Sequence, residues 1–158
     1  MNSDELRALT SDMMTASLSV LGPENRSAPF DIDRDCRDTG GQPSGRVYVG
    51  RAYNSNLPSR DVGLQDLRAL SAAWSAAGYA PRAETRWDRP SVSVLVRHES
   101  TGIDLAAGVN IAGKFHIFIT SQCAELGPVD KRTQETGKSS DADAAEGPAV
   151  GEIRNVLG

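Results

Sequence analysis

The stretch DIDRDCRD places aspartates at alternating positions, as a calcium-binding loop does. Asp31, Asp33 and Asp35 occupy positions one, three and five of the EF-hand template. That template also needs a glycine at position six and a bidentate glutamate at position twelve, where this chain has Cys36 and Gln42. The stretch is therefore not predicted to bind calcium.

Two cysteines and two histidines raise the question of a zinc site, but no close pair such as C-x2-C is present. In alternating strands His98 continues the apolar face of its strand, whereas His116 lies on the opposite, polar face beside Lys114. Side chains on opposite faces of one sheet cannot meet at one ion. No metal site is predicted from Cys36, His98, His116 and Cys123.

Motifs for nucleophilic or phosphate chemistry are also missing from the sequence. The loop 40–45 lacks the lysine and the following helix that hold a phosphate, so we expect a connector there. Glu84 and Asp104 can be paired as carboxylates, but acids are so common in the chain that the pair carries no information. The sequence predicts a protein that is not an enzyme and needs no cofactor. An enzyme whose site is built from scattered residues is an alternative.

Two amphipathic helices are predicted, at 2–21 and at about 61–77. Asn2 and Glu5 have the spacing of a capping box, and Gly22 with Pro23 ends the first helix. Gly78 ends the second helix. The apolar stripes are Leu6, Leu9, Met13, Ala16 and Val20 in the first helix, and Leu64, Leu67, Leu70, Trp74 and Ala77 in the second.

The other apolar residues alternate with polar ones. Between 82 and 123 they predict an antiparallel meander of about four strands, because the connections are only two or three residues long. Further strands are expected at 46–53 and, more weakly, at 30–36. The order α-β-β-α-β-β-β-β predicts an α+β fold, a two-layer sandwich with an antiparallel sheet of about five to six strands and two helices on one face.

We expect a single domain at 1–124. The segment 125–158 is polar and acidic and has little apolar patterning, so we expect it to be disordered. Four apolar residues near its end would form one helical turn, which either frays or docks on another surface: Val150, Ile153, Val156 and Leu157.

Cys36 and Cys123 fall at the ends of predicted strands and point toward the apolar side. We favour a disulfide between them, with two buried free thiols as the alternative. A disulfide of this span would stabilise the fold by about 4 to 5 kcal/mol on the chain-entropy model. It would also indicate an oxidising compartment.

The composition of the 158 residues, 39% hydrophobic and 24% charged, is typical of a globular domain, with no apolar run long enough to span a membrane. A net charge of −4 argues against nucleic acid as a partner. No leader pattern is visible at the N-terminus, which leaves a cytoplasmic protein or an ectodomain whose leader or anchor is not part of this sequence. The sequence leaves the ligand and the oligomeric state open.

One group of residues is a candidate partner surface on the open face of the sheet, although ordinary solvated strand residues would give the same pattern. It combines arginines with aromatic rings: Arg46, Tyr48, Arg86, Trp87 and Arg97.

The order of a first helix, a strand with DCRD, a helix ending in WSAAGY, a meander and a closing ITSQC resembles small actinobacterial cell-envelope lipoprotein ectodomains. The resemblance covers about residues 3–124. It implies a secreted or surface-anchored, non-enzymatic module that binds a protein or an envelope component. The family's signal peptide and lipobox cysteine are not in this sequence. The competing hypothesis is a cytoplasmic immunity-type or accessory binding protein with free thiols.

Overall fold

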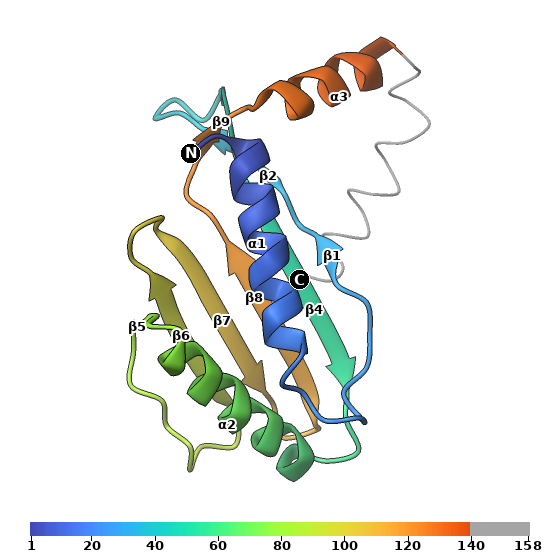
Figure 1. Ribbon diagram of the computed structural model, residues 1–158, viewed down its shortest axis with the longest axis vertical. Helices are drawn as coiled ribbons and strands as arrows, with labels where there is room; N and C mark the ends of the chain where they lie inside the picture. Colours follow the sequence, from blue (N-terminus) through green and yellow to red (C-terminus); the bar gives the residue numbers. More distant parts are fainter. Residues whose placement is uncertain (140–158) are drawn as a thin grey trace.

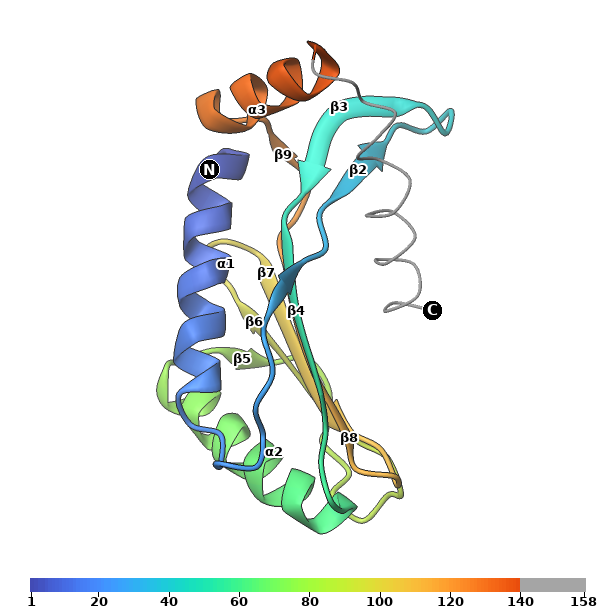
Figure 2. The ribbon, with the colours of Figure 1, turned by 90° about the vertical axis from the view of Figure 1, so that its right-hand side faces the viewer.

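The computed structural model describes residues 1–139 and has the α+β architecture that the sequence predicts. Six antiparallel strands form the main sheet in the order β1-β4-β8-β7-β6-β5. Helices α1 (Ser3–Leu18) and α2 (Arg60–Ala76) pack on one side of this sheet, and no described helix lies on the other side (Figures 1 and 2). The strands are β1 (Phe30–Asp31), β4 (Gly50–Asn56), β5 (Ala80–Pro81), β6 (Val92–His98), β7 (Ile103–Val109) and β8 (Lys114–Thr120).

Helix α1 begins with the predicted capping box, in which the Asn2 side chain accepts from the Glu5 amide. Its buried face is rotated slightly from the predicted one, since Ala16 is exposed while Met14 and Ser17 are buried. The Ser17 hydroxyl accepts a 3.0 Å hydrogen bond from the indole Nε1 of Trp74. This bond joins α1 to α2 and gives the buried indole N–H of Trp74 the acceptor it needs, while the hydroxyl itself donates to the Met13 carbonyl.

Helix α2 buries Leu67, Leu70 and Trp74 of its predicted stripe, together with Gly63 and Asp66. Of the other two predicted residues, Leu64 is half-buried and Ala77 is exposed. Gly63 permits a close approach to the sheet, because a Cβ atom there would lie 2.4 Å from Cγ2 of Val109. The core beneath both helices is formed by the inward residues of the meander, all nearly inaccessible to solvent: Val92, Val94, Val96, Ile103, Leu105, Ala107, Val109, Phe115, Ile117 and Ile119.

The two strands predicted before α2 are each divided, and the divisions create a second sheet. The expected strand 30–36 forms β1 and β2 (Arg34–Arg37), and the expected strand 46–53 forms β3 (Pro43–Tyr48) and β4. With β9 (Ala124–Glu125), β2 and β3 make a three-stranded sheet in the order β2-β3-β9. The break after β1 occurs at Asp33, whose carboxylate accepts from the Gly50 amide and pairs with Arg7.

Helix α3 (Pro128–Ser139) lies within the segment 125–158, for which the sequence predicts disorder. Its first amides are held by α1, since the Asp4 carboxylate accepts from the amides of Val129 and Asp130. Asp130 also pairs with Arg7 at 2.8 Å. The rest of the expected tail, 140–158, with its predicted apolar turn, lies outside the described residues.

A buried polar cluster joins the segment after α1 to α2 and β4. The Asp66 carboxylate accepts from the Gly22 amide and from Nδ2 of Asn25, each at 3.0 Å. Oδ1 of Asn25 in turn accepts from the hydroxyls of Tyr53 and Ser55. Because each of these bonds satisfies a polar group away from water, the cluster fixes the path of the chain between α1 and β1.

Candidate functional site

The face of the main sheet opposite the helices is the strongest candidate for a binding surface, and we call it the open face. On β8 the residues Phe115, Ile117 and Ile119 point toward the helices, so His116 and Phe118 point away from them. The register of the paired strands carries this alternation across the sheet. No described helix covers the outward residues (Figure 2).

An apolar row crosses the open face at right angles to the strands. Phe30 pairs with Ala52, Ala52 with Phe118, Phe118 with Ala106, and Ala106 with Leu95. Leu95, at the end of the row, is 40% exposed. Ala52 is fully buried, so the accessible residues of the row are Phe30, Phe118, Ala106 and Leu95. Apolar residues that gather on a surface between polar ones are typical of a site that contacts a partner.

Phe118 lies between two hollows of about 550 Å³ each and lines both of them. The first, which we call the His116 hollow, is built from the end of β4, the start of β6, the end of β7 and the start of β8. Its polar lining residues are Asn54, Ser55, Asn56, Ser91, Ser93, Asn110, Lys114 and His116. None of its lining residues is acidic, and Lys114 is its one permanently charged group.

The imidazole of His116 forms part of the wall of this hollow. It lies over Gly108 of the neighbouring strand, because a Cβ atom on Gly108 would be 2.6 Å from its Cε1 and 3.1 Å from its Nε2. Its ring centroid is 5.1 Å from that of Phe118. Burial lowers the pKa of His116 from the ordinary value, so the ring is neutral at neutral pH and has one donor and one acceptor nitrogen.

The second hollow, the Arg97 hollow, lies at the other end of Phe118, where β8 approaches the small sheet. Arg97 of β6 forms a bidentate ion pair with Asp104 of β7, with N–O distances of 2.7 and 3.0 Å. Arg34 and Tyr48 also line this hollow, and the side chain of Tyr48 is 41% exposed. Arg34 belongs to none of the ion pairs found among the described residues.

The five residues of the predicted partner surface do not form one surface. Tyr48 and Arg97 lie together in the Arg97 hollow. Arg46 lines a smaller hollow beside α1 and α3, and its guanidinium donates to the Cys123 carbonyl at 2.9 Å. Arg86 and Trp87 lie in the loop between β5 and β6, on the side of the helices, where the Arg68 guanidinium of α2 is 4.3 Å from the Trp87 ring.

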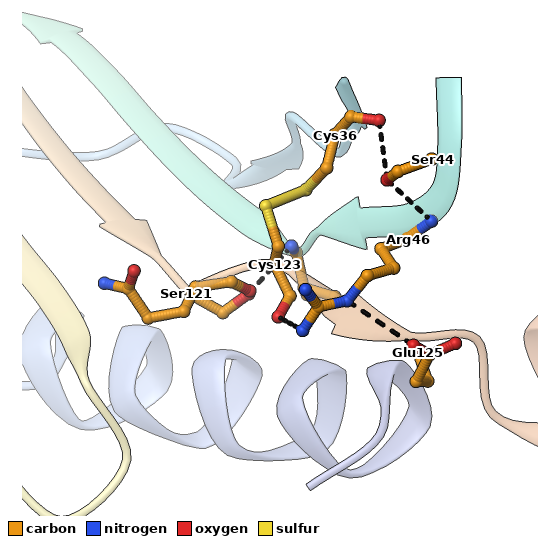
Figure 3. The surroundings of a disulfide bond; sticks show 8 residues. Cys36, Ser44, Arg46, Ser121, Cys123 and Glu125 are labelled. Carbon is orange, nitrogen blue, oxygen red and sulfur yellow. Dashed lines mark hydrogen bonds and ion pairs between the residues drawn. A yellow bond between two sulfur atoms is a disulfide. The ribbon is translucent and has the colours of Figure 1, made fainter. Parts of the chain in front are cut away.

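Cys36 and Cys123 form the predicted disulfide, with Cα atoms 6.1 Å apart (Figure 3). The bond links β2 to the residue that precedes β9, so it ties together the outer strands of the small sheet. Ser44 donates to the Cys36 carbonyl, and Arg46 forms an ion pair with Glu125 at 3.5 Å. The described residues hold no free cysteine.

The acidic stretch that suggested calcium has structural contacts. Asp31 pairs with Arg51 at 2.7 Å, and Asp38 accepts from the amides of Gly40 and Gln42 in the following turn. Among the side chains that the structure describes, no three or more histidines, cysteines or acids gather in a way that could hold a metal ion.

The other sequence candidates are also separated. His98 lies near Thr101 and Tyr79, and its Nδ1 is 2.7 Å from the Thr101 hydroxyl. Glu84 pairs with Arg86, whereas Asp104 pairs with Arg97, so these two carboxylates do not meet each other. His98 and Glu84 line neither of the two hollows, whereas Asp104 lines the Arg97 hollow.

Sequence reasoning missed Phe118, Lys114 and His116 as a group. The alternation of β8 placed Lys114 and His116 on a polar face, where each alone is an ordinary solvated residue. The sequence feature that could have indicated the group is Phe118, a large aromatic residue at a strand position that points away from the helices. The register with the adjacent strands, which the sequence does not contain, brings these residues beside Asn54 and Ser93.

Comparisons of the chain with models of protein families, with curated proteins and with solved structures found no match. Of the helices that the structure describes, none is long and apolar enough to cross a membrane. The fold, the disulfide and the open face therefore carry the functional argument.

Proposed function

We propose that this protein is a non-catalytic binding module of the bacterial cell envelope, and that it binds an envelope component through the open face. The observation that carries the proposal is the apolar row from Phe30 to Leu95, set between the His116 and Arg97 hollows. A sheet covered on one side normally presents a polar surface to water on the other. Here the second side combines apolar contact area with polar groups that can specify a ligand.

The disulfide supports an extracytoplasmic location. Disulfides such as Cys36–Cys123 persist in oxidising compartments and are rare where glutathione keeps thiols reduced. A secreted or lipid-anchored ectodomain, as the resemblance to envelope lipoproteins implies, meets this condition. The competing cytoplasmic accessory protein would keep two free thiols. Alkylation in intact cells, followed by intact-mass measurement, separates the two, because the proposal expects no alkylated cysteine until a reductant is added.

The shape of the open face favours binding over catalysis. Both hollows are open to solvent, and Phe118 lines each of them. Among residues 1–139, the hydrogen bonds of histidine rings are those of His98 with Thr101 and Ser100, so His116 is not paired with a hydroxyl to activate. A nucleophile needs such a partner to become reactive.

Co-sedimentation with an isolated actinobacterial envelope fraction tests the proposal. We expect the unaltered protein to pellet with the envelope, and Phe118→Ser and Leu95→Asp to reduce the bound fraction about tenfold or more, because hot-spot contacts at the centre of an interface contribute most of its affinity. Ile111→Asp is the matched control, since Ile111 is 71% exposed in the turn after β7 and outside the row. Equal binding by all four proteins would refute the proposal, as would self-association through the open face in place of envelope binding.

A further inference from the structure

The polar groups of the His116 hollow suit a particular kind of ligand. The side chains of Asn54 and Ser93 make no hydrogen bond among the described residues, and neither do Lys114 and His116. Among the described residues, the buried side-chain nitrogen or oxygen without a hydrogen-bond partner is Nε of Arg51. The unpaired polar atoms of the hollow are therefore accessible to solvent. They are therefore free to bind a ligand that enters the hollow.

The charge of the hollow favours a ligand with an isolated negative group. The chain carries a net charge of −4, yet no acidic residue lines this hollow. Lys114 supplies one ammonium group at its rim, with three donors and no acceptor. Because no acidic residue of the hollow competes for this ammonium group, it can pair with one carboxylate or phosphate of a ligand.

The uncharged groups favour a ligand with hydroxyls. An asparagine amide and a serine hydroxyl each donate and accept hydrogen bonds, as does the neutral His116 ring. An inorganic anion uses donors alone, whereas a sugar hydroxyl uses both a donor and an acceptor. The volume of about 550 Å³ is also in the range of organic ligand sites and exceeds what a single small anion needs.

The rings of the open face complete this chemistry. Phe118 and His116 lie side by side along β8 and present apolar surface to the hollow. The C–H face of a pyranose ring packs against such surfaces, while its equatorial hydroxyls reach the polar groups around them. Beyond Phe118, the Arg97 hollow offers a second cation, Arg34, so the two hollows form a track along the sheet.

We propose that the open face binds an acidic polysaccharide, with a carboxylate-bearing sugar unit in the His116 hollow and the chain continuing over Phe118 toward Arg34. The inference rests on the proposed function and specifies its ligand. Lys114 neutralises the carboxylate, Asn54 and Ser93 bind hydroxyls, and Phe118 contacts the sugar ring.

Isothermal titration calorimetry of the full chain tests this ligand. The probes are tetragalacturonic acid, neutral maltotetraose, inorganic phosphate and a thymidine octanucleotide. We expect saturable binding of tetragalacturonic acid that is about tenfold or more tighter than that of maltotetraose, because charge-assisted hydrogen bonds are stronger than neutral ones. Inorganic phosphate and the oligonucleotide should bind more weakly than the uronic acid.

Two variants localise the binding. Lys114→Gln removes the charge from the hollow and should weaken tetragalacturonic acid binding about tenfold while leaving maltotetraose binding unchanged. Lys131→Gln is the matched control, since Lys131 is exposed on α3 and outside the hollow, and it should bind as the unaltered chain does. Circular dichroism confirms that both variants are folded.

The outcomes separate this inference from the proposed function. Equal binding of the acidic and neutral sugars, equal effects of the two lysine variants, or preferential binding of the oligonucleotide would overturn the inference. If Phe118→Ser still reduces envelope binding in those cases, the ligand class is wrong and the proposed function stands. If neither the envelope nor any sugar binds through the open face, both are wrong.

Discussion

His116 of β8 lies directly over Gly108 of β7, and this contact defines the wall of the hollow on the open face. The two residues are partners in the register, and a Cβ atom at Gly108 would lie 2.6 Å from Cε1 of the imidazole and 2.9 Å from the Val92 carbonyl oxygen. The absence of a side chain at position 108 leaves room for the ring over the neighbouring strand, where it lines the hollow beside Phe118.

Gly108→Ala is therefore expected to displace the His116 ring and to lower the free energy of unfolding by about 1 to 3 kcal/mol, the usual cost of overpacking a buried position. Gly40→Ala is the control, because Gly40 lies in an exposed loop and its nearest contact would be an ordinary 3.4 Å. Urea denaturation measures the stability, and the NMR signals of the imidazole report the displacement. Equal stability of the two variants would contradict the contact.

The buried position of His116 also predicts a pH dependence. Burial lowers the pKa of His116 below 6.5, so the unfolded chain takes up this proton before the folded protein does. The free energy of unfolding should therefore fall as the pH drops below 6.5, until the folded pKa is passed. Each pH unit between the two pKa values contributes about 1.4 kcal/mol.

Denaturation at a series of pH values tests this dependence. His116→Gln should show a flatter curve between neutral pH and the lower pKa, because the titrating group is gone. His98→Gln, at a residue on the other face of the sheet, should keep the slope that His116 contributes. Identical curves for the unaltered chain and His116→Gln would show that the imidazole titrates alike in the folded and unfolded states.

Substitution of Asp66 is expected to lower the free energy of unfolding more than substitution of an exposed carboxylate. Its two oxygens accept from the Gly22 amide and from Nδ2 of Asn25, and the residue is only 8% exposed. In Asp66→Asn one of the two accepting oxygens is replaced by an NH2 group, which faces a donor and cannot accept its hydrogen bond. The substitution should lower the free energy of unfolding by about 1 to 3 kcal/mol. Asp12→Asn, an exposed change on α1, should have a small effect. Thermal denaturation of the two variants provides the comparison.

The disulfide should account for much of the stability of the small sheet. It joins residues 87 positions apart, and the chain-entropy model gives about 4 to 5 kcal/mol for a loop of that size. The double variant Cys36→Ser with Cys123→Ser should lose stability of this order, and reductant should have the same effect on the unaltered protein. A double variant as stable as the parent would indicate that the sheet is held by its other contacts.

The parts of the fold predicted from sequence are those that local chemistry determines. The Asn2 capping box, the alternation of β8 and the short turns of the meander each depend on neighbours in the chain, and the structure contains all of them. The disulfide was predicted from strand parity, and Cys36 is buried on β2 as expected, whereas Cys123 is half-buried in the segment between β8 and β9.

Long-range contacts explain what the sequence did not show. The strand expected at 30–36 divides because Asp33 binds Arg7 and the Gly50 amide, which are distant in sequence. Helix α3 has little apolar patterning, and its first amides are bound by Asp4 from the other end of the described chain. Arg86 and Trp87 lie apart from Tyr48 and Arg97 because their loop packs against α2, where the Arg68 guanidinium lies over the tryptophan ring.

Hydroxyl-radical footprinting of the protein bound to the envelope fraction tests the central claim, that the open face is the binding surface. Mass spectrometry would compare the oxidation of Phe118, His116 and Leu95 with that of Trp87, which lies on the helix side. We expect binding to protect the three residues of the open face and to leave Trp87 oxidised as in the free protein. Protection of Trp87 with unchanged oxidation of Phe118, His116 and Leu95 would contradict the account.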